Sequence, residues 1–395
     1  MFEIFKNKMY WLYLLLVAVV IAVFSFAMIG SRSTVKVQQI PVAVVDLDHS
    51  TTSQQIVKRL KNQFKDDDAT LKLTTVNSQK QLTKDFNHKK YYGAIVIKKD
   101  FAKNLASQTQ YLQSMVIAAK TSTTNANAAN LPQQAGIDFQ VNAGANATVS
   151  SALTTAFTKM GQALSTRISQ QELSVLTQNN VSVATSQLSF LTSPIKTTVK
   201  TVHPIKDKTI SGMLPLLITA ISWMAGLITS ILLWREHKKM SGHDVLSAKS
   251  ITGQILGGGL VTVVTSVVFY CLGLALDLYL PNFWIFVANF IGITFIFYLI
   301  QACVLDWFGM KGWPLLILVW LFGMGTMSYI PEMLSGFYRY GIYSWVPMRF
   351  AMDIYNNMLY YANVASTSAQ SWFILGCVGG AALILMYLSS LRKAK

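Results

Sequence analysis

The sequence has 395 residues, of which 52% are hydrophobic and only 13% are charged, and its formal net charge is +16. These values exclude an ordinary soluble domain and favour a chain that lies largely within a membrane. The three cysteines all fall within apolar stretches, so the polar part of the chain holds no disulfide.

Six apolar stretches each approach the ~20 residues that a helix needs to cross a bilayer. They begin near Tyr10, Met213, Ile251, Phe283, Trp313 and Trp372. We therefore predict an α-helical multi-pass membrane protein with six spans, one plus five, and a polar domain over 31–208 inserted after the first span. The first span, 10–30, is too long for the apolar region of a signal peptide and lacks a small-residue cleavage site, which favours an uncleaved signal anchor. The other five spans form a transmembrane domain over 211–391.

Lys and Arg residues near the span ends predict the orientation. The inner segments would hold ten of them: Lys6, Lys8, Arg235, Lys238, Lys239, Lys249, Lys311, Arg392, Lys393 and Lys395. The short outer loops would hold only Arg339 and Arg349. This bias predicts a protein of the cell membrane whose terminal segments, 1–9 and 392–395, are cytoplasmic and whose domain 31–208 is extracellular.

The predicted outer domain is strongly basic. Residues 31–208 contain 21 of the 33 Lys and Arg residues but only 10 of the 17 Asp and Glu residues. Such a domain would be drawn to anionic lipid headgroups or wall polymers, although a solvated surface without a particular partner fits equally well. Nucleic acid is not a sensible partner on this side of the membrane.

The first part of the outer domain, 35–120, alternates between strand and helix patterns. Strands are predicted at Ile40–Val45, Leu71–Val76, Tyr92–Ile97 and Met115–Ala119. Helices are predicted at Thr51–Phe64, Ser78–His88 and Phe101–Ala106. This alternation is typical of a small α/β layer domain.

The second part of the outer domain has a different character. From Thr121 to Asn146 it is rich in Ala, Asn, Gln, Ser and Thr, which indicates a loop. Apolar residues then recur every three or four positions and predict a long helix over 145–178, packed on the α/β part or on a second copy of itself. The Ser-Pro and His-Pro pairs within 190–208 indicate an extended linker.

No constellation of catalytic residues stands out. The chain has no phosphate-binding G-x-x-x-x-G-K-[ST] motif, and its histidines have no metal-ligand spacing. The sequence Asp46-Leu-Asp48-His49 is better explained as a turn before a helix cap than as a metal cluster. We therefore expect neither an enzyme nor a bound cofactor or metal.

The spans contain glycines but almost no charge. Close helix packing, within one subunit or across a dimer, is predicted at Gly253, Gly257, Gly376 and Gly380. Asp277 and Asp306 are expected at span ends, where water reaches them. The near absence of buried carboxylates argues against a proton-coupled transporter, so the energy source would lie outside this chain.

Two loops are candidates for function. The predicted cytoplasmic loop after the second span is either a docking element for a soluble partner or a positive-inside anchor; its candidate residues are Arg235, Glu236, Lys238, Lys239, His243 and Asp244. The predicted outer loop, Tyr329–Ser371, suits short helices that form a re-entrant lid or an amphipathic belt. The candidate lid residues are Pro331, Glu332, Trp345, Pro347, Arg349 and Asp353.

Several segments, in this order, resemble the ABC-2 type exporter permeases and, among them, the YhgE/Pip-like (phage infection protein) group. The first is the strand Ile40-Pro-Val-Ala-Val-Val-Asp-Leu-Asp48. The second is Tyr92-Gly-Ala-Ile-Val-Ile-Lys-Lys-Asp-Phe101. The others are Pro194-Ile-Lys196, His203-Pro204, Gly212, Pro215, Trp223, Gly226 and Pro347-Met-Arg349. The outer region is much shorter than in many members of that group.

The resemblance implies a homodimeric or heterodimeric permease driven by a separate cytoplasmic ABC ATPase subunit. The ATPase would contact the loop around Glu236 and the segment Phe2–Lys8. The function expected from it is outward transport of a hydrophobic or amphipathic cargo, such as a lipid-like molecule, a peptide or a drug. The alternative is a non-transporting membrane-anchored surface protein, or a phage or ligand receptor, that acts through its outer domain.

Overall fold

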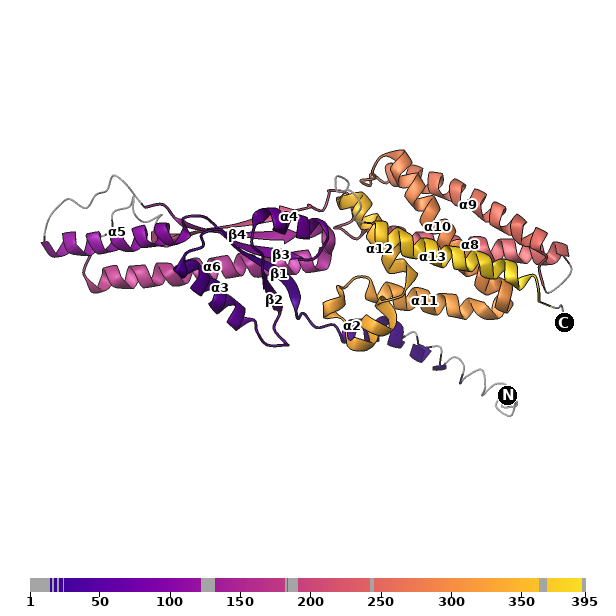
Figure 1. Cartoon of the computed structure of the whole chain (residues 1–395), viewed down its shortest axis with the longest axis horizontal. Helices are drawn as coiled ribbons and strands as arrows, with labels where there is room; N and C mark the ends of the chain where they lie inside the picture. The colour runs from indigo at the N-terminus through magenta and orange to yellow at the C-terminus, as the bar shows by residue number, and fades with distance from the viewer. Residues whose placement is uncertain are drawn as a thin grey trace, which may run out of the picture. The chain divides into compact units, whose positions relative to one another are not determined.

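The computed structural model of the protein describes residues 25–121, 132–181, 191–241, 245–361 and 368–392, with Leu15, Ala18, Val19, 21–23 and Val183. Most of the predicted first span therefore lies outside the described residues. Tertiary contacts divide the chain into a sheet unit, Val37–Pro204, and a helical unit, Met1–Lys36 with Ile205–Lys395. Figure 1 labels the elements of each unit.

The sheet unit is built on a five-stranded sheet with the order β2-β1-β3-β4-β5. The strands are β1 (Ile40–Asp46), β2 (Leu71–Thr75), β3 (Gly93–Ile97), β4 (Ala135–Asn142) and β5 (Ile195–Val202). β1 is parallel to β2 and β3, β4 is antiparallel to β3, and β5 is parallel to β4. In this register Val42 pairs with both Leu73 and Gly93.

Alongside the sheet, the described residues of this unit form four α-helices with described bounds and one short turn. They are α3 (Thr51–Gln63), α4 (Gln79–Asn87), α5 (Phe101–Thr121), η3 (Ala143–Ala145) and α6 (Ala147–Gln178). Three of the helices begin where a side chain accepts a backbone N–H of the first turn, because Ser50, Ser78 and Asn146 cap α3, α4 and α6. The predicted strands at β1, β2 and β3 and the helices at α3, α4 and α6 are confirmed.

The helices cover both faces of the sheet. On one face, Leu82 and Phe86 of α4 pack in a cluster with Ala94 and Val96 of β3. On the other face, the ring of Phe157 of α6 stacks on Phe139 of β4, with ring centroids 5.0 Å apart. The apolar stripe of the long helix therefore packs on the α/β part of the same chain.

Three predictions for this unit are wrong. Met115–Ala119 is not a strand, and the helix predicted at Phe101–Ala106 continues through it as α5. Leu112 and Met115 lie one helical turn apart and are buried in a cluster with Leu176 and Leu191. The predicted loop Thr121–Asn146 contains the strand β4, and the predicted linker 190–208 contains the edge strand β5.

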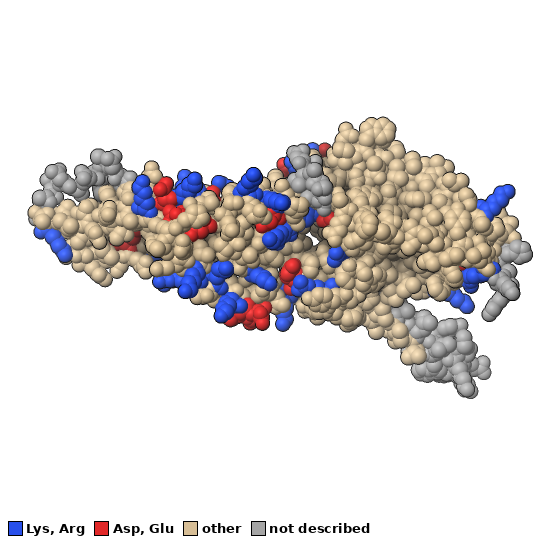
Figure 2. All heavy atoms as spheres, in the orientation of Figure 1, with Lys and Arg blue, Asp and Glu red and all other residues tan. Residues whose placement is uncertain are grey.

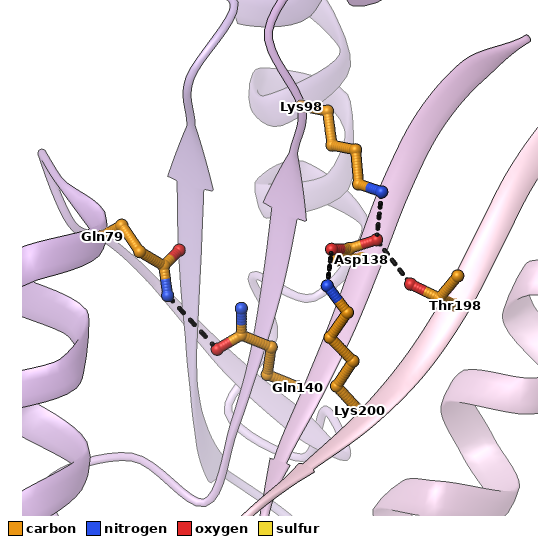
Figure 3. Close-up of polar contacts among 6 residues, drawn as sticks. All are labelled: Gln79, Lys98, Asp138, Gln140, Thr198 and Lys200. Atoms are coloured by element: carbon orange, nitrogen blue, oxygen red, sulfur yellow. Dashed lines mark hydrogen bonds and ion pairs between the residues drawn. The ribbon is translucent and has the colours of Figure 1, made fainter.

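A buried carboxylate explains why β4 is a strand despite its polar residues. Asp138 accepts hydrogen bonds from Lys98 Nζ at 2.8 Å, from Lys200 Nζ at 2.7 Å and from the Thr198 hydroxyl (Figure 3). Burial would raise the pKa of the Asp138 carboxyl, but these hydrogen bonds outweigh it and hold the pKa below its usual value. The network ties β4 to β5 and to the end of β3, as Figure 3 shows.

The helical unit consists mainly of long α-helices that follow one another along the chain. Its first elements with described bounds are the π-helical turn η2 (Phe26–Gly30) and the short α2 (Ser31–Ser33). After the sheet unit come α8 (Leu214–Ser241), α9 (Ala248–Ala275), α10 (Phe283–Phe308), η4 (Gly309–Gly312) and α11 (Trp313–Thr326). The last elements are η5 (Pro331–Met333), the π-helical η6 (Phe337–Tyr343), α12 (Pro347–Tyr360) and α13 (Ala369–Ser389).

Four stretches of the described residues are long and apolar enough to cross a membrane: Leu214–Ser241, Ala248–Ala275, Phe283–Thr326 and Ala369–Ser389. The third consists of α10 and α11, separated by η4. α11 has 14 residues, so at ~1.5 Å per residue it is shorter than a ~30 Å hydrocarbon core. The described residues thus support four spans, and the count of six stays a prediction.

One buried acid should make the stability of the sheet unit depend on pH. Glu172 of α6 is 7% exposed, and burial raises the pKa of its carboxyl from 4.5 to about 7. The folded state therefore binds this proton more tightly than the unfolded chain, and its stability falls as the pH rises from about 4.5 to about 7. We expect Glu172→Gln to abolish this fall and to stabilise the unit at pH 8 by about 3 kcal/mol.

Pulse proteolysis of the full chain at pH 5 and pH 8 would measure the effect. Gln171 is exposed, so Gln171→Glu adds a neighbouring carboxyl in water and should leave the pH dependence unchanged. A Glu172→Gln chain that kept the wild-type pH dependence would contradict the prediction.

Candidate functional site: the helical bundle and its basic end

The centre of the bundle is the contact between α8 and α10. Gly226 of α8 lies so close to α10 that an added Cβ would come within 3.0 Å of the backbone nitrogen of Tyr298. Beside it, Gln301 of α10 donates from Nε2 to the carbonyl oxygen of Trp223, at 3.0 Å. The side chains of Gln301 and Trp223 are fully buried. A small residue and a buried amide therefore hold the two helices together at short range.

α12 is part of this bundle core. The predicted short helices of the segment Tyr329–Ser371 are present, but α12 is not a peripheral cover. Met348, Ile354 and Tyr355 are buried in one cluster with α8 and α10, and the Tyr355 hydroxyl lies 2.8 Å from Ser222 Oγ of α8. The amphipathic helix α12, which lies between two apolar stretches in the sequence, thus packs inside the helical unit.

The six candidate lid residues have different environments. Pro331 and Glu332 form η5, Pro347 is the buried first residue of α12, and Trp345 is 54% exposed. The Arg349 guanidinium lies over the Phe350 ring at 4.4 Å and donates to the carbonyl oxygen of Tyr343. Asp353 accepts a hydrogen bond from Ser371 Oγ at 2.7 Å, which joins α12 to α13.

The predicted cytoplasmic loop is largely helical. Arg235, Glu236, Lys238 and Lys239 lie on the last two turns of α8, which continues to Ser241. Arg235, Glu236 and Lys239 are exposed, whereas the Lys238 ammonium lies 5.2 Å from the Trp234 ring centre. The other two candidates, His243 and Asp244, lie outside the described residues.

Cations gather at one end of the bundle. The end of α8, the start of α9, the turn η4 and the end of α13 meet there, and Figure 2 shows that most of the visible bundle surface away from this end is uncharged. We call this surface the basic end; its described cations are Arg235, Lys238, Lys239, Lys249, Lys311 and Arg392.

The four predicted packing glycines divide into two pairs. An added Cβ at Gly253 would lie 3.0 Å from His237 Nε2, and one at Gly257 would lie 3.5 Å from Leu233, so both face α8. Gly376 and Gly380 have no described neighbour within 4 Å of an added Cβ. The closest packing is instead at Gly258, where the added atom would lie 2.2 Å from the Tyr298 ring.

The expectation for Asp277 and Asp306 is confirmed in their positions near span ends, but one oxygen atom of Asp306 is shielded from water. Asp277 is exposed and pairs with Lys208 at 2.6 Å, as its place after a span implies. Asp306, however, lies in the last turn of α10, and its Oδ2 atom is buried without a hydrogen-bond partner among the described residues. Sequence reasoning also missed Gln254 and Gln301, which are fully buried. The sequence signal that could have identified them is a polar residue within an otherwise apolar helix.

The sheet unit has a cavity of about 600 Å³ beside α3, lined by residues that include Asp46, His49, Lys58 and Asn77. The Asp46 carboxylate is occupied locally, because it accepts from the backbone N–H groups of Asp48 and His49 and from Ser53 Oγ. Asp46 thus closes the turn and the cap that the sequence predicts. The described residues hold no cluster of three metal-ligating side chains.

Long apolar helices that pack around buried polar groups define a polytopic membrane protein. The family model described as ABC-2 family transporter protein matches residues 8–388, nearly the whole chain, and the protein belongs to this family. No curated protein and no solved structure shows significant similarity to it. The family supports a role as a permease, the membrane component of a transporter, and in general implies a partner ATPase.

Gly258 offers a direct test of the bundle packing. Tyr298 is fully buried and donates its hydroxyl proton to the carbonyl oxygen of Gln254, so its ring cannot easily move aside. We expect Gly258→Ala to destabilise the bundle by about 1–3 kcal/mol. Gly380→Ala is the matched control, since nothing described lies near it, and it should be neutral or slightly stabilising. Thermal unfolding in detergent measures both, and equal melting temperatures for the two variants would refute the packing.

Proposed function

We propose that this protein is the membrane subunit of an exporter that moves a hydrophobic or amphipathic cargo outward and is powered by a separate cytoplasmic ATPase. The observation that carries the proposal is the family match, which covers both the sheet unit and the helical bundle. The sequence contains no phosphate-binding loop of its own. The orientation follows the charge bias, with the basic end in the cytoplasm and the sheet unit outside the cell.

The basic end is the proposed docking surface for the ATPase. A soluble partner needs side chains that project from the membrane, and Arg235, Glu236 and Lys239 are exposed on the last turns of α8. These turns continue directly from the helix that contacts α10 and α12, so a displacement at the docking surface would be transmitted along a rigid element to the bundle core. His243 and Asp244 would extend the surface.

The cargo would pass between two permease copies. Gly376 and Gly380 support this arrangement, because they leave a flat strip on α13 that no described residue of this chain covers within 4 Å. On this proposal α12 and the candidate lid residues form the outer boundary of the path. The bond between Tyr355 and Ser222 and the bond between Asp353 and Ser371 would then hold α12, as part of the bundle core, against α8 and α13.

The alternative is a surface receptor that does not transport. The basic side chains over the visible face of the sheet unit favour it (Figure 2), since they suit an anionic wall polymer, lipid headgroup or phage component. A receptor needs an anchor of only one or two spans, however, whereas the described residues already contain four stretches that could cross a membrane.

Charge reversal at the docking surface tests the proposal. We expect Glu236→Lys and Lys239→Glu each to reduce the amount of co-purifying ATPase subunit at least tenfold, because like charges placed across an interface cost several kcal/mol. Quantitative mass spectrometry after gentle crosslinking in native membranes would measure it. Lys72→Glu, on the exposed side of β2, is the matched control. Wild-type amounts of co-purifying ATPase subunit in both docking variants would contradict the proposal that the basic end is the docking surface.

A further inference from the structure

Asp306, which is partly buried, and Gln254 form a polar pair between α10 and α9. Gln254 is fully buried, and its Nε2 atom lies 3.4 Å from Asp306 Oδ1. Tyr298 holds the backbone of Gln254 in place by donating to its carbonyl oxygen at 2.7 Å. The apolar residues around the pair include Ile251, Leu305 and Met386. The pair thus lies beside a hydrophobic cluster, near the point where α10 ends and η4 of the basic end begins.

Two oxygen atoms of this pair have no hydrogen-bond donor among the residues that the structure describes. Asp306 Oδ2 and Gln254 Oε1 are both buried and have no hydrogen-bond partner among the described residues. An ionised carboxylate can only accept hydrogen bonds, and so can the amide oxygen, so neither atom can satisfy the other. Leaving both unpaired would be costly, and more so if one belongs to a buried charge.

A single proton removes the conflict. A carboxylic acid has one O–H donor, which the amide oxygen of Gln254 could accept, while Gln254 Nε2 continues to donate to Asp306 Oδ1. The two side chains would then share two antiparallel hydrogen bonds, and no charge would remain in the apolar surroundings. We propose that Asp306 and Gln254 form a proton-binding site in which a protonated Asp306 joins α10 to α9.

A metal cation would satisfy the same atoms less well. Na⁺ or Ca²⁺ requires about six oxygen ligands, whereas this place offers two free oxygens. Among the described residues there is also no group of three His, Cys, Asp or Glu side chains that could hold a metal. The number of available ligands therefore favours a proton.

The described titratable groups nearby do not neutralise Asp306 in another way. On the packed elements these groups are His237 and Lys238 of α8, Lys249 of α9, Tyr298 and Cys303 of α10, Tyr387 of α13, and Arg392. None of them forms an ion pair with Asp306 within the described part of the chain. Arg392 instead donates to the carbonyl oxygen of Trp307 at 2.6 Å, and His237 Nδ1 lies 2.9 Å from the carbonyl oxygen of Leu233.

The site would couple a proton to the separation of two helices. Loss of the proton leaves a charged carboxylate whose buried Oδ2 atom needs water, and a separation of α9 from α10 would admit water to this atom. The protonated pair therefore favours the packed arrangement, and its deprotonation favours a more open one. This inference goes beyond the proposed export function and does not depend on it.

Infrared spectroscopy of the full chain tests the inference, in a maltoside detergent that contributes no carbonyl absorption. Because Glu172 is also partly protonated at neutral pH, the comparison uses a Glu172→Gln background, in which we expect a protonated-carboxyl band that is lost when Asp306→Asn is added. The band should move to higher wavenumber in Gln254→Leu, because the acid then loses its hydrogen-bond acceptor. Asp306→Asn keeps an amide donor and carries no charge, so it should melt at or above the wild-type temperature.

Three results would overturn the proposal. Identical carboxyl bands in the Glu172→Gln background with and without Asp306→Asn would mean that Asp306 is ionised. An unshifted band in Gln254→Leu would mean that Gln254 is not the partner. A rise in melting temperature with NaCl or KCl over choline chloride at equal ionic strength, lost in Asp306→Asn, would mean that the site holds a metal cation.

Discussion

The close approach of α8 and α10 at Gly226 is the constraint on which the helical unit depends. Within a bilayer the helices gain little from hydrophobic burial against one another, so short-range packing and hydrogen bonds must hold them together. Gly226 brings the backbones together, and Gln301 bonds the two helices across the contact. α12 then packs on α8, and α9 packs on α10 through Gly258 and Tyr298. Each further contact relies on the position of this first pair.

The same packing determines where polar groups can lie and hence where function can reside. Buried polar side chains such as Ser222, Gln254 and Gln301 lie between helices, while six cations of the bundle gather at the basic end. A membrane component driven by another subunit needs a charged docking surface joined by rigid helices to an interior that can exist in two arrangements. α8 provides such a connection, because it runs from the buried Trp223 to the exposed Lys239.

Elements were predictable from the sequence where the signal was local. β1 and β3 are continuous apolar runs, and α6 has a regular apolar stripe, so these two strands and this helix could be predicted. β4 was missed because its polar residue Asp138 is satisfied by Lys98 and Lys200, which are distant in sequence. α5 was cut short for a similar reason, since its buried residues face Leu176 and Leu191. Of the candidate site, the exposed charges on α8 could be predicted, but the shielding of the Asp306 Oδ2 atom could not, because it depends on where α9 packs.

ATP hydrolysis by the purified native complex tests the central claim most directly. The account predicts that the full chain co-purifies in mild detergent with a soluble subunit that contains a phosphate-binding loop. It also predicts that ATP hydrolysis requires both subunits and ceases when the lysine of that loop is replaced. A crosslinked preparation of the full chain without any nucleotide-hydrolysing partner would contradict the account and favour a surface receptor that acts through the sheet unit.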